Sequence, residues 1–315
     1  INIPTGEILA MASYPDFNPN NRQGATIDDF RNRAISATFE PGSTVKPLVL
    51  MTALQQGLVQ PDSVIDPHPY MLDGHRIRDV GYYPELSMTG ILQKSSDTGV
   101  SRLSLAMPVQ HLIDTYRNFG FGTNTGLGLT GESAGLLPQR KYWSQLDRAT
   151  FAFGYGLMVT PLQLAHVYAT IGGFGLERPL SITRIDPPVI GHRVMPEEIA
   201  HQVEHMMESV ALPGGGGVKA AVRDYRVAVK TGTAKKIDDS GKYVDKYVAY
   251  TAGVAPASDP RFALVVVIND PQNGAYYGGA VSAPVFSEIM GNVLRLENVK
   301  PDGLAPDSSH LIVMR

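Results

Sequence analysis

Ser43 and Lys46 lie three positions apart, where a loop gives way to an apolar run. The pair Pro41 and Gly42 interrupts whatever precedes it, and residues 48–54 predict a buried helix whose first turn holds both side chains. Such residues are neighbours on a helix, so the amine can take the hydroxyl proton, and the free N–H groups of the helix start lie near any oxyanion. The spacing predicts a nucleophile, a base and part of an oxyanion hole. The alternative is a serine cap with a chance lysine.

Ser95 and Asp97 form a second polar group, in a short turn between two helical stretches. They offer a hydroxyl and a second polar side chain two residues on. Serine and aspartate in such turns also serve as helix caps, so the pair by itself leaves both interpretations open.

A third group, Lys230 to Thr233, closes an apolar strand. Lys230 and Gly232 should point to one face of this strand, and Thr231 and Thr233 to the other. Glycine lets another backbone approach, so a substrate peptide can lie along this edge with Lys230 and the threonine hydroxyls attracting its terminal carboxylate. The alternative is an edge lysine that discourages aggregation.

Ser-x-x-Lys, Ser-x-Asp and Lys-Thr-Gly occur in that order on a predicted helix, turn and strand. Here the chain resembles the penicillin-recognising serine acyltransferases, whose motifs are S-x-x-K, S-x-N and K-[S/T]-G. Residues 39–47, 151–165, 214–221 and 230–236 resemble the transpeptidase domain of a class B penicillin-binding protein, and the likeness extends over essentially the whole chain. Within that class the chain is most similar to the septal, cell-division enzyme of Gram-negative bacteria.

The resemblance implies a role for each motif residue. Ser43 is the acylated nucleophile, Lys46 its base and Ser95 the proton-relay hydroxyl. Lys230 tunes the site and attracts the donor carboxylate, and the backbone N–H groups of Ser43 and Thr233 form the oxyanion hole. A donor of this kind contributes roughly 3–4 kcal/mol to transition-state stabilisation in comparable enzymes.

Asp97 departs from the family pattern, which has asparagine there. An ionised carboxylate accepts hydrogen bonds but cannot donate one to a substrate carbonyl. A nearby carboxylate also favours the ammonium form of Lys46 and weakens it as a base. If Asp97 instead caps its own turn, it has neither effect.

The resemblance implies a peptidoglycan D,D-transpeptidase that cross-links stem peptides during septum synthesis. Its acyl-enzyme at Ser43 forms with loss of terminal D-Ala, and β-lactams acylate the same serine. It further implies the periplasmic face of the inner membrane, an upstream anchor and non-catalytic module absent from this chain, and membrane division partners including a polytopic glycosyltransferase. No cofactor or metal is expected.

Two other functions are compatible with the three motifs. A β-lactamase or D,D-carboxypeptidase uses water as the acceptor, and fast deacylation in class A β-lactamases needs a glutamate-activated water. Glu85, in a suggestive turn, precedes the Ser95 motif instead of following it, so we expect slow deacylation. The second alternative is a non-catalytic β-lactam sensor or a structural division protein. Only turnover on a peptide or thioester substrate distinguishes an enzyme from these.

His201, Glu204 and His205 match an H-x-x-E-H metalloprotease pattern. The apolar stripe of the predicted helix at 196–211 leaves these three residues and Glu208 on its solvated side, so a zinc site is not favoured.

Composition bounds the remaining function classes. The 315 residues are 43% hydrophobic and 18% charged, with a net charge of −3 and no basic block, so nucleic acid is not an expected partner. Cysteine is absent, which excludes disulfides and thiolate ligands. No apolar run approaches the roughly 18–20 residues of a membrane span.

The expected fold class is α/β (α+β), an antiparallel sheet flanked by helices with an all-helical subdomain, as in serine β-lactamases and transpeptidases. Residues 1–297 should form the transpeptidase domain, with the helical subdomain inserted at about 88–173. The predicted strands, helices and less regular segments are as follows: strands at 226–233, 248–254 and 262–268, a hairpin at 1–11 that joins their sheet, helices at 196–211 and 283–296, a flexible joint at 214–217, and a loosely structured tail at 298–315.

Three tyrosines, Tyr243, Tyr247 and Tyr250, lie between Lys230 and the next strand. Aromatic side chains give rigid contact area to an extended peptide or a bulky β-lactam substituent. We predict that at least Tyr247 walls the binding cleft; the alternative is a hairpin whose tyrosines pack on one another.

Overall fold

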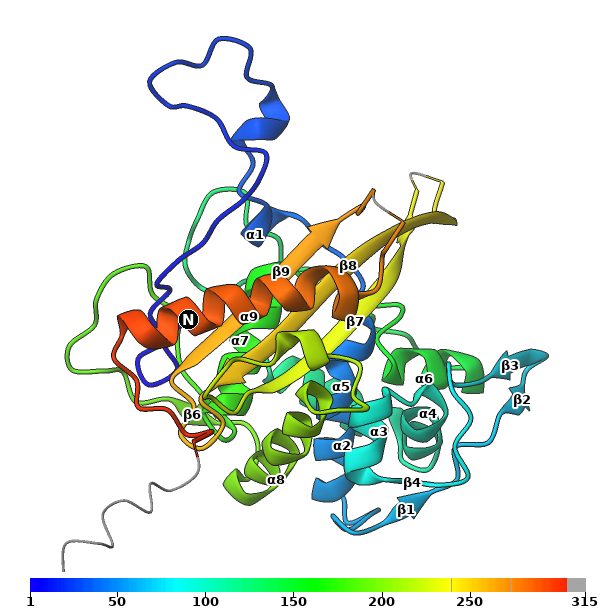
Figure 1. The fold of residues 1–315 in the computed structure, drawn as a ribbon. Coiled ribbons are helices and arrows are strands. Elements are labelled where there is room, and N and C mark those ends of the chain that lie inside the picture. The colour runs from blue at the N-terminus through cyan, green and yellow to red at the C-terminus, as the bar shows by residue number, and fades with distance from the viewer. Residues whose placement is uncertain (239, 273, 305–315) are drawn as a thin grey trace, which may run out of the picture.

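The computed structural model describes residues 1–304 except 239 and 273, and its centre is an antiparallel sheet with the strand order β7-β8-β9 (Figure 1). The three strands span Ala228–Ile237, Tyr243–Ala255 and Phe262–Asn269. The predicted meander is confirmed, with longer strands than expected because the hairpin between β7 and β8 continues the pairing as far as Ile237 and Tyr243.

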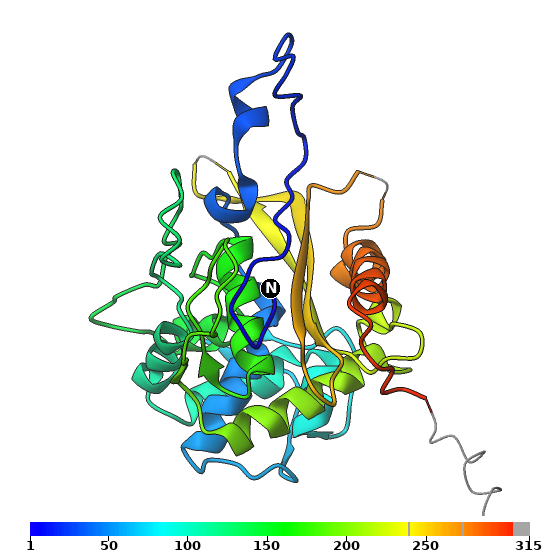
Figure 2. The same ribbon diagram turned by 90° about the vertical axis from the view of Figure 1, so that its left-hand side faces the viewer.

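The N-terminal residues join this sheet through a few contacts only. The amino group of Ile1 donates to the carbonyl of Ala263, and the N–H of Ile3 donates to Arg261. The predicted hairpin over 1–11 is wrong, because the chain turns back tightly after Ile3 and its next bridge, from Glu7, goes to a residue outside the sheet. The segment before α1 then projects from the body as an arm, dark blue in Figures 1 and 2.

Helices cover both faces of the sheet (Figure 2). On one face lies α9 (Gly278–Leu296), which buries Ala283, Phe286 and Met290 at helical spacing. On the other lies α7 (Pro161–Gly172), which packs against β9 and β8 and is buried from Leu162 to Gly172 because further helices cover its outer side.

Beside the sheet, a second region of the molecule is helical. Its helices surround α2 (Lys46–Gln55), which is buried from Lys46 to Ala53. A helix that is apolar on all sides belongs in a core, and here other helices enclose it. The surrounding and neighbouring helices are α3 (Met88–Lys94), α4 (Asp97–Leu105), α5 (Val109–Asn118), α6 (Gln145–Ala152) and α8 (Glu197–Glu208).

Short elements complete the described part of the chain. The remaining helical segments are η1 (Ile27–Phe30), α1 (Arg33–Ser36), η2 (Gly42–Val45), η3 (Ser209–Ala211) and η4 (Val218–Ala220). The remaining strands are β1 (Val64–Ile65), β2 (Tyr70–Leu72), β3 (His75–Ile77), β4 (Leu86–Ser87), β5 (Leu176–Glu177) and β6 (His192–Arg193).

The division into a domain at 1–297 with a helical insert at about 88–173 stays a prediction. Within that range, α7 packs on the sheet and the other helices cluster around α2 (Figure 1). The connection between α5 and α6, residues 119–144, is rich in glycine and carries no helix.

The predicted flexible joint and loose tail need correction where the structure describes them. The N–H of Gly217 donates to Val210, and a Cβ on Gly279 of α9 would lie 2.0 Å from the carbonyl oxygen of Gly216, so residues 214–217 are packed in place. In the tail, Asp302 accepts from the N–H groups of Arg226 and Ser258. Residues 305–315 lie outside the described residues.

Within residues 1–304, apart from 239 and 273, no helix combines the length and hydropathy that crossing a membrane requires.

Candidate active site

Ser43 is the second residue of η2, immediately before α2, and it is partly exposed between buried neighbours. Gly42 has φ +48°, and a Cβ there would lie 2.4 Å from the hydroxyl of Tyr250. A Cβ on Gly154 would lie 2.2 Å from the carbonyl oxygen of Gly42. Only glycine fits at both positions, so two backbones meet directly behind Ser43 and fix it at the helix start.

Lys46 begins α2 and is fully buried. Its Nζ donates to the carbonyl oxygen of Ser95 at 2.6 Å, to Ser95 Oγ at 3.1 Å and to Asp97 Oδ1 at 2.6 Å. An ammonium has three donors, and these contacts use all of them. Among the described residues, no hydrogen bond joins Lys46 to Ser43 Oγ, so the resting amine is directed at the Ser95–Asp97 turn.

Ser95 lies between two lysine amines. Its Oγ receives hydrogen bonds from Lys46 Nζ and from Lys230 Nζ, the latter at 2.9 Å. Ser95 ends α3 with φ 56° and ψ 47°, in the left-handed region that a residue with a Cβ seldom adopts. Such strain, held by the surrounding structure, is typical of functional turns and here aims the hydroxyl between the amines.

Asp97 faces Lys46 and does not cap its own turn. It is the first residue of α4, and the cap is Ser96, whose Oγ accepts from the N–H of Gly99 at 2.8 Å. Asp79 holds this cap by accepting from Ser96 Oγ. The Asp97 side chain is 39% exposed, whereas its partner Lys46 is buried. The ion pair therefore forms one wall of the site, and its carboxylate remains accessible to a substrate.

On the opposite side, β7 presents the Lys-Thr-Gly-Thr sequence with the expected alternation. Lys230 is fully buried, whereas Thr231 and Thr233 are partly exposed, so the threonines are the side chains that a carboxylate can reach. Burial, assisted by the charge of Lys46, lowers the pKa of Lys230 well below its usual value, and Asp97 opposes this shift.

The structure shows why position 232 requires glycine. A Cβ there would lie 2.0 Å from the ring of Tyr250, which is buried beneath the strand and donates its hydroxyl to the carbonyl of Glu40. Thr233 Oγ1 accepts from the N–H of Gly278 at the start of α9.

Tyr247 stacks on Tyr276, with ring centroids 4.0 Å apart and planes at 15°, and Tyr276 stacks in turn on Tyr277. Tyr277 precedes Gly278, whose N–H donates to Thr233 Oγ1. The three stacked tyrosines therefore begin beside β7. The sequence analysis did not single out Tyr276 and Tyr277, although two adjacent tyrosines directly before a helix are visible in the sequence. That Tyr247 walls the cleft stays a prediction.

The other tyrosines occupy different places. Tyr243 donates to the carboxylate of Glu40, which also accepts from the N–H of Gly156 at 2.8 Å. Burial raises the pKa of Glu40. Burial also raises the pKa of Tyr155 to about 12, with smaller contributions from Asp97 and Glu40. The Tyr155 ring lies 6.0 Å from that of Tyr243, centroid to centroid, and both rings line a pocket.

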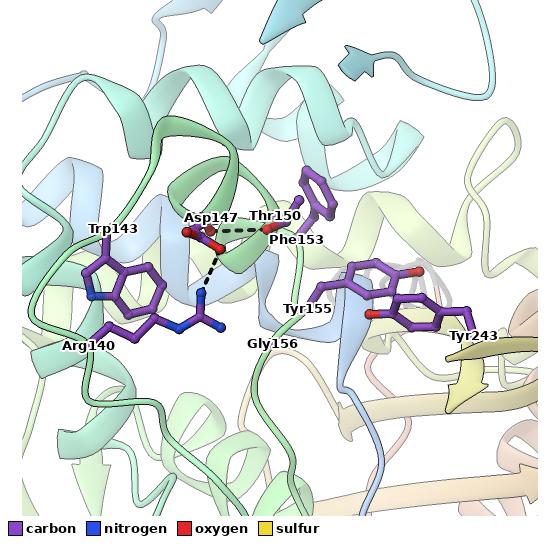
Figure 3. A pocket seen from close by; sticks show the side chains of 8 residues that line it. All are labelled: Arg140, Trp143, Asp147, Thr150, Phe153, Tyr155, Gly156 and Tyr243. Atoms are coloured by element: carbon purple, nitrogen blue, oxygen red, sulfur yellow. Dashed lines mark hydrogen bonds and ion pairs between the residues drawn. The ribbon is translucent and has the colours of Figure 1, made fainter. Parts of the chain in front are cut away.

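That pocket has a volume of about 390 Å³ and was not anticipated from the sequence (Figure 3). Aromatic rings and an ion pair line most of it. Its lining residues are Arg140, Trp143, Asp147, Thr150, Phe153, Tyr155, Gly156 and Tyr243.

The H-x-x-E-H pattern does not form a metal site in the part of the chain that the structure describes. His201 and His205 are exposed, and His205 pairs with Glu208. The expectation that Glu204 is solvated is wrong: it is 1% exposed because α8 packs against both α2 and β7, and burial raises its pKa to about 8.

Comparison with known proteins gives one consistent result. Residues 1–291 match the family described as the penicillin binding protein transpeptidase domain. The peptidoglycan D,D-transpeptidase FtsI of Escherichia coli K12 is 63% identical over 314 residues, which cover 100% of this chain and 53% of that protein. The protein of the same name from Buchnera aphidicola (Schizaphis graminum) is 55% identical over 304 residues, 96% of this chain and 54% of that protein.

Among solved structures, the transpeptidase domain of Burkholderia pseudomallei penicillin-binding protein 3 superposes with a TM-score of 0.88 at 35% identity. The likeness covers 97% of this chain and 88% of that one. The serine transpeptidase/β-lactamase fold predicted from the sequence is thereby confirmed. The chain spans about half the length of the curated relatives it matches.

Proposed function

Because this chain belongs to the penicillin-binding protein transpeptidase family, we propose that it carries the active site of a peptidoglycan D,D-transpeptidase that cross-links stem peptides during septum synthesis. The observation that carries this proposal is the Ser95 hydroxyl, which accepts hydrogen bonds from both Lys46 and Lys230, and Lys46 follows Ser43 by one helical turn. Two amines and a hydroxyl in contact provide a path for one proton in each half of an acyl transfer.

In the first half-reaction, Ser43 Oγ attacks the carbonyl carbon of the penultimate D-Ala. The hydroxyl proton passes to the free amine of Lys46, and Ser95 relays a proton to the nitrogen of the departing D-Ala. An ester at Ser43 remains. In the second half-reaction, the amine of an acceptor peptide attacks this ester, its proton returns by the same path, and Ser43 regains its hydroxyl. β-Lactams form the same ester but release no leaving group that makes room for the acceptor.

The oxyanion is assigned to the backbone N–H groups of Ser43 and Thr233. Ser43 lies in the first turn of a helix, where N–H groups have no partner within the helix. The carbonyl oxygen of Thr233 lies 3.7 Å from a Cβ built on Gly42, so the outward polar groups of Thr233 face the helix start. In an antiparallel strand the N–H and C=O of one residue point the same way, which supports this assignment.

The strand edge is the proposed donor-peptide site. Thr231 and Thr233 receive the terminal carboxylate, Gly232 permits close approach, and the buried Lys230, whose pKa is lowered, completes the proton path through Ser95. Tyr247, together with Tyr276, forms the aromatic wall beside it.

Asp97 restrains the reaction. Lys46 acts as a base only after losing a proton, and its ion pair with Asp97 at 2.6 Å stabilises the charged form. An asparagine would stabilise the ammonium less and would offer an N–H donor to the substrate carbonyl. The chain therefore acylates more slowly than an asparagine-bearing relative.

The family resemblance supports a proposal for the wider setting. The proposed location is the periplasmic face of the inner membrane, and the proposed partners are membrane division proteins including a polytopic glycosyltransferase. β-Lactam antibiotics are the proposed inhibitors.

Incubation with a penicillin followed by peptide mass spectrometry tests the chemistry. An adduct on Ser43 that is released slowly supports the proposal. A thioester donor then distinguishes the acceptor: added amine must increase thioester consumption and yield an amide product. Rapid hydrolysis with no amide product would assign a carboxypeptidase or β-lactamase activity, and an adduct without any thioester turnover would assign a sensor.

A further inference from the structure

Lys94 is a third lysine beside the Ser95 turn, and the proposed reaction does not use it. It is the last residue of α3 and directly precedes Ser95. Its Nζ donates to the carbonyl oxygen of Gly214 at 2.8 Å and lies 5.9 Å from the centre of the Tyr83 ring, within the range of a cation–π contact. These two contacts hold the ammonium beside the loop at 214–217.

Lys94 has hydrogen-bond donors to offer a ligand. An ammonium has three donors, and the contact with Gly214 uses one of them. Among the described residues, the lysines that form ion pairs with carboxylates are Lys46, Lys235 and Lys246. The charge of Lys94 is therefore not matched by a carboxylate of the described chain.

The loop that Lys94 contacts leads to the strand edge. A Cβ built on Gly216 would lie 3.6 Å from Thr231 Oγ1, and the N–H of Gly216 donates to the carbonyl of Gln93 at 3.3 Å. Gly214 and Gly216 are both exposed. Lys94 and residues 214–217 therefore form an accessible rim, which we call the acceptor rim, at the Thr231 end of the edge.

The order of the two half-reactions brings the acceptor to this end. Residues 228–230 of β7 are buried and Ile237 is exposed, so a donor whose carboxylate lies at Thr231 extends its upstream part toward Ile237. After acylation that part stays on Ser43, and the released D-Ala leaves the Thr231 end vacant. Aminolysis retraces acylation in reverse, so the acceptor nitrogen takes the place of the D-Ala nitrogen. The rest of the acceptor then lies toward the acceptor rim.

We propose that Lys94 binds the terminal carboxylate of the acceptor stem peptide. The inference rests on the proposed function, because that function supplies an acceptor that is itself a stem peptide ending in D-Ala. The acceptor amine forms the amide bond as the ester C–O bond at Ser43 breaks, and its proton returns to Ser43 Oγ. Meanwhile the carboxylate at the end of the acceptor accepts hydrogen bonds from the ammonium of Lys94.

Two acceptors that differ only in terminal charge test this assignment. A thioester donor acylates Ser43, and Nα-acetyl-lysyl-D-alanine or its C-terminal amide is added; both offer the same ε-amine. We expect the carboxylate acceptor to give an aminolysis-to-hydrolysis ratio about fivefold higher at equal concentration, as for an accessible ion pair. The ratio does not depend on how fast the acyl-enzyme forms. Lys94→Gln should remove the preference, and Lys94→Arg should keep it.

Lys242→Gln is the matched control, because Lys242 is an exposed lysine in the hairpin beyond Ile237, at the other end of the strand edge. It must keep the fivefold preference. Equal use of the two acceptors by the unsubstituted chain overturns the proposal. A preference that survives Lys94→Gln also overturns it, since the carboxylate would then lie elsewhere, for example at the threonines of β7.

Absence of amide product with either acceptor would instead refute the proposed transfer to an amine. Calorimetric binding of the same two peptides to the Ser43→Ala variant would then decide the role of Lys94. The carboxylate peptide should bind about fivefold more tightly than the amide, and adding Lys94→Gln should abolish this difference. Equal binding of the two peptides, or a difference that Lys94→Gln leaves intact, would overturn the assignment.

Discussion

The two walls of the Ser43 site hold their lysines in opposite ways. On the helical wall, Lys46 is buried but has a carboxylate partner, Asp97, at 2.6 Å. On the strand wall, Lys230 is buried without direct contact to a carboxylate among the described residues, and its pKa falls well below the usual value. Both amines donate to Ser95 Oγ.

This difference shows how one fold can place two buried amines with unlike partners on the same hydroxyl. Desolvation disfavours the ammonium form, and a nearby carboxylate restores it. Only Lys46 has a carboxylate partner among the described residues, and we expect asparagine at position 97 to make the two lysines more alike.

The largest expected effect comes from removing the Ser43 hydroxyl. Ser43→Ala should abolish covalent labelling by penicillin while leaving the fold intact, because no other serine lies at the helix start one turn before Lys46. Intact-mass spectrometry and far-UV circular dichroism check the two halves of this prediction. A persistent adduct would place the nucleophile elsewhere.

Glu204 shows what burial does to a carboxylate that lacks a partner. Its Oε1 is buried without a hydrogen bond among the described residues, and burial, then Glu208 and Asp302, raises its pKa to about 8 against the partial opposition of Arg226. An unfolded glutamate titrates near about 4.3, so between these values the folded chain keeps a proton that the unfolded chain loses. Stability should fall by up to about 1.4 kcal/mol per pH unit from pH 5 to 8.

Glu204→Gln should flatten this pH dependence, as urea unfolding at several pH values can measure. Glu198→Gln, on the exposed side of the same helix, is the control and should leave the slope unchanged. A parent protein whose stability does not decline over this range would contradict the burial argument.

Asp97→Asn should speed acylation of Ser43 near neutral pH. Each 1.4 kcal/mol removed from the free energy of deprotonating Lys46 is worth about tenfold in rate, and the new amide donor acts in the same direction. Stopped-flow acylation with a chromogenic β-lactam at one pH measures the gain. An unchanged or slower rate would show that the ion pair does not limit the reaction.

Tyr247→Ala should have the smallest effect, a loss of a few-fold in acylation rate with bulky β-lactams. The stack on Tyr276 orients the Tyr247 ring, and the variant loses this contact. Tyr14→Ala, a change in an exposed tyrosine of the projecting arm, is the control. If several β-lactams acylated the Tyr247→Ala variant at the parent rate, Tyr247 would have no part in the cleft.

Local patterns in the sequence predicted much of the site's geometry. Helical spacing places Ser43 one turn before Lys46, and strand alternation separates buried Lys230 from the exposed threonines. These relations depend on residues close in sequence. The contact of Asp97 with Lys46 spans 51 positions, and only the family resemblance pointed to it.

Other features depended on packing that no local pattern records. Glu204 follows the polar face of α8, yet α2 and β7 cover that helix on more than one side. Arg140 and Trp143 lie in a long connection without periodicity, and their pocket exists only because Tyr243 returns from a distant hairpin. Asp302 is held by backbone groups of Arg226 and Ser258, which nothing in the tail's composition indicates.

The central claim is that the ion pair between Lys46 and Asp97 sets the rate of acylation at Ser43. The pH–rate profile of acylation, measured for the parent and for Asp97→Asn under single-turnover conditions, tests it most directly. We expect the variant to reach its maximal rate at lower pH, because its lysine loses the proton more easily. Superimposable profiles would contradict the claim, since the carboxylate would then have no influence on the base.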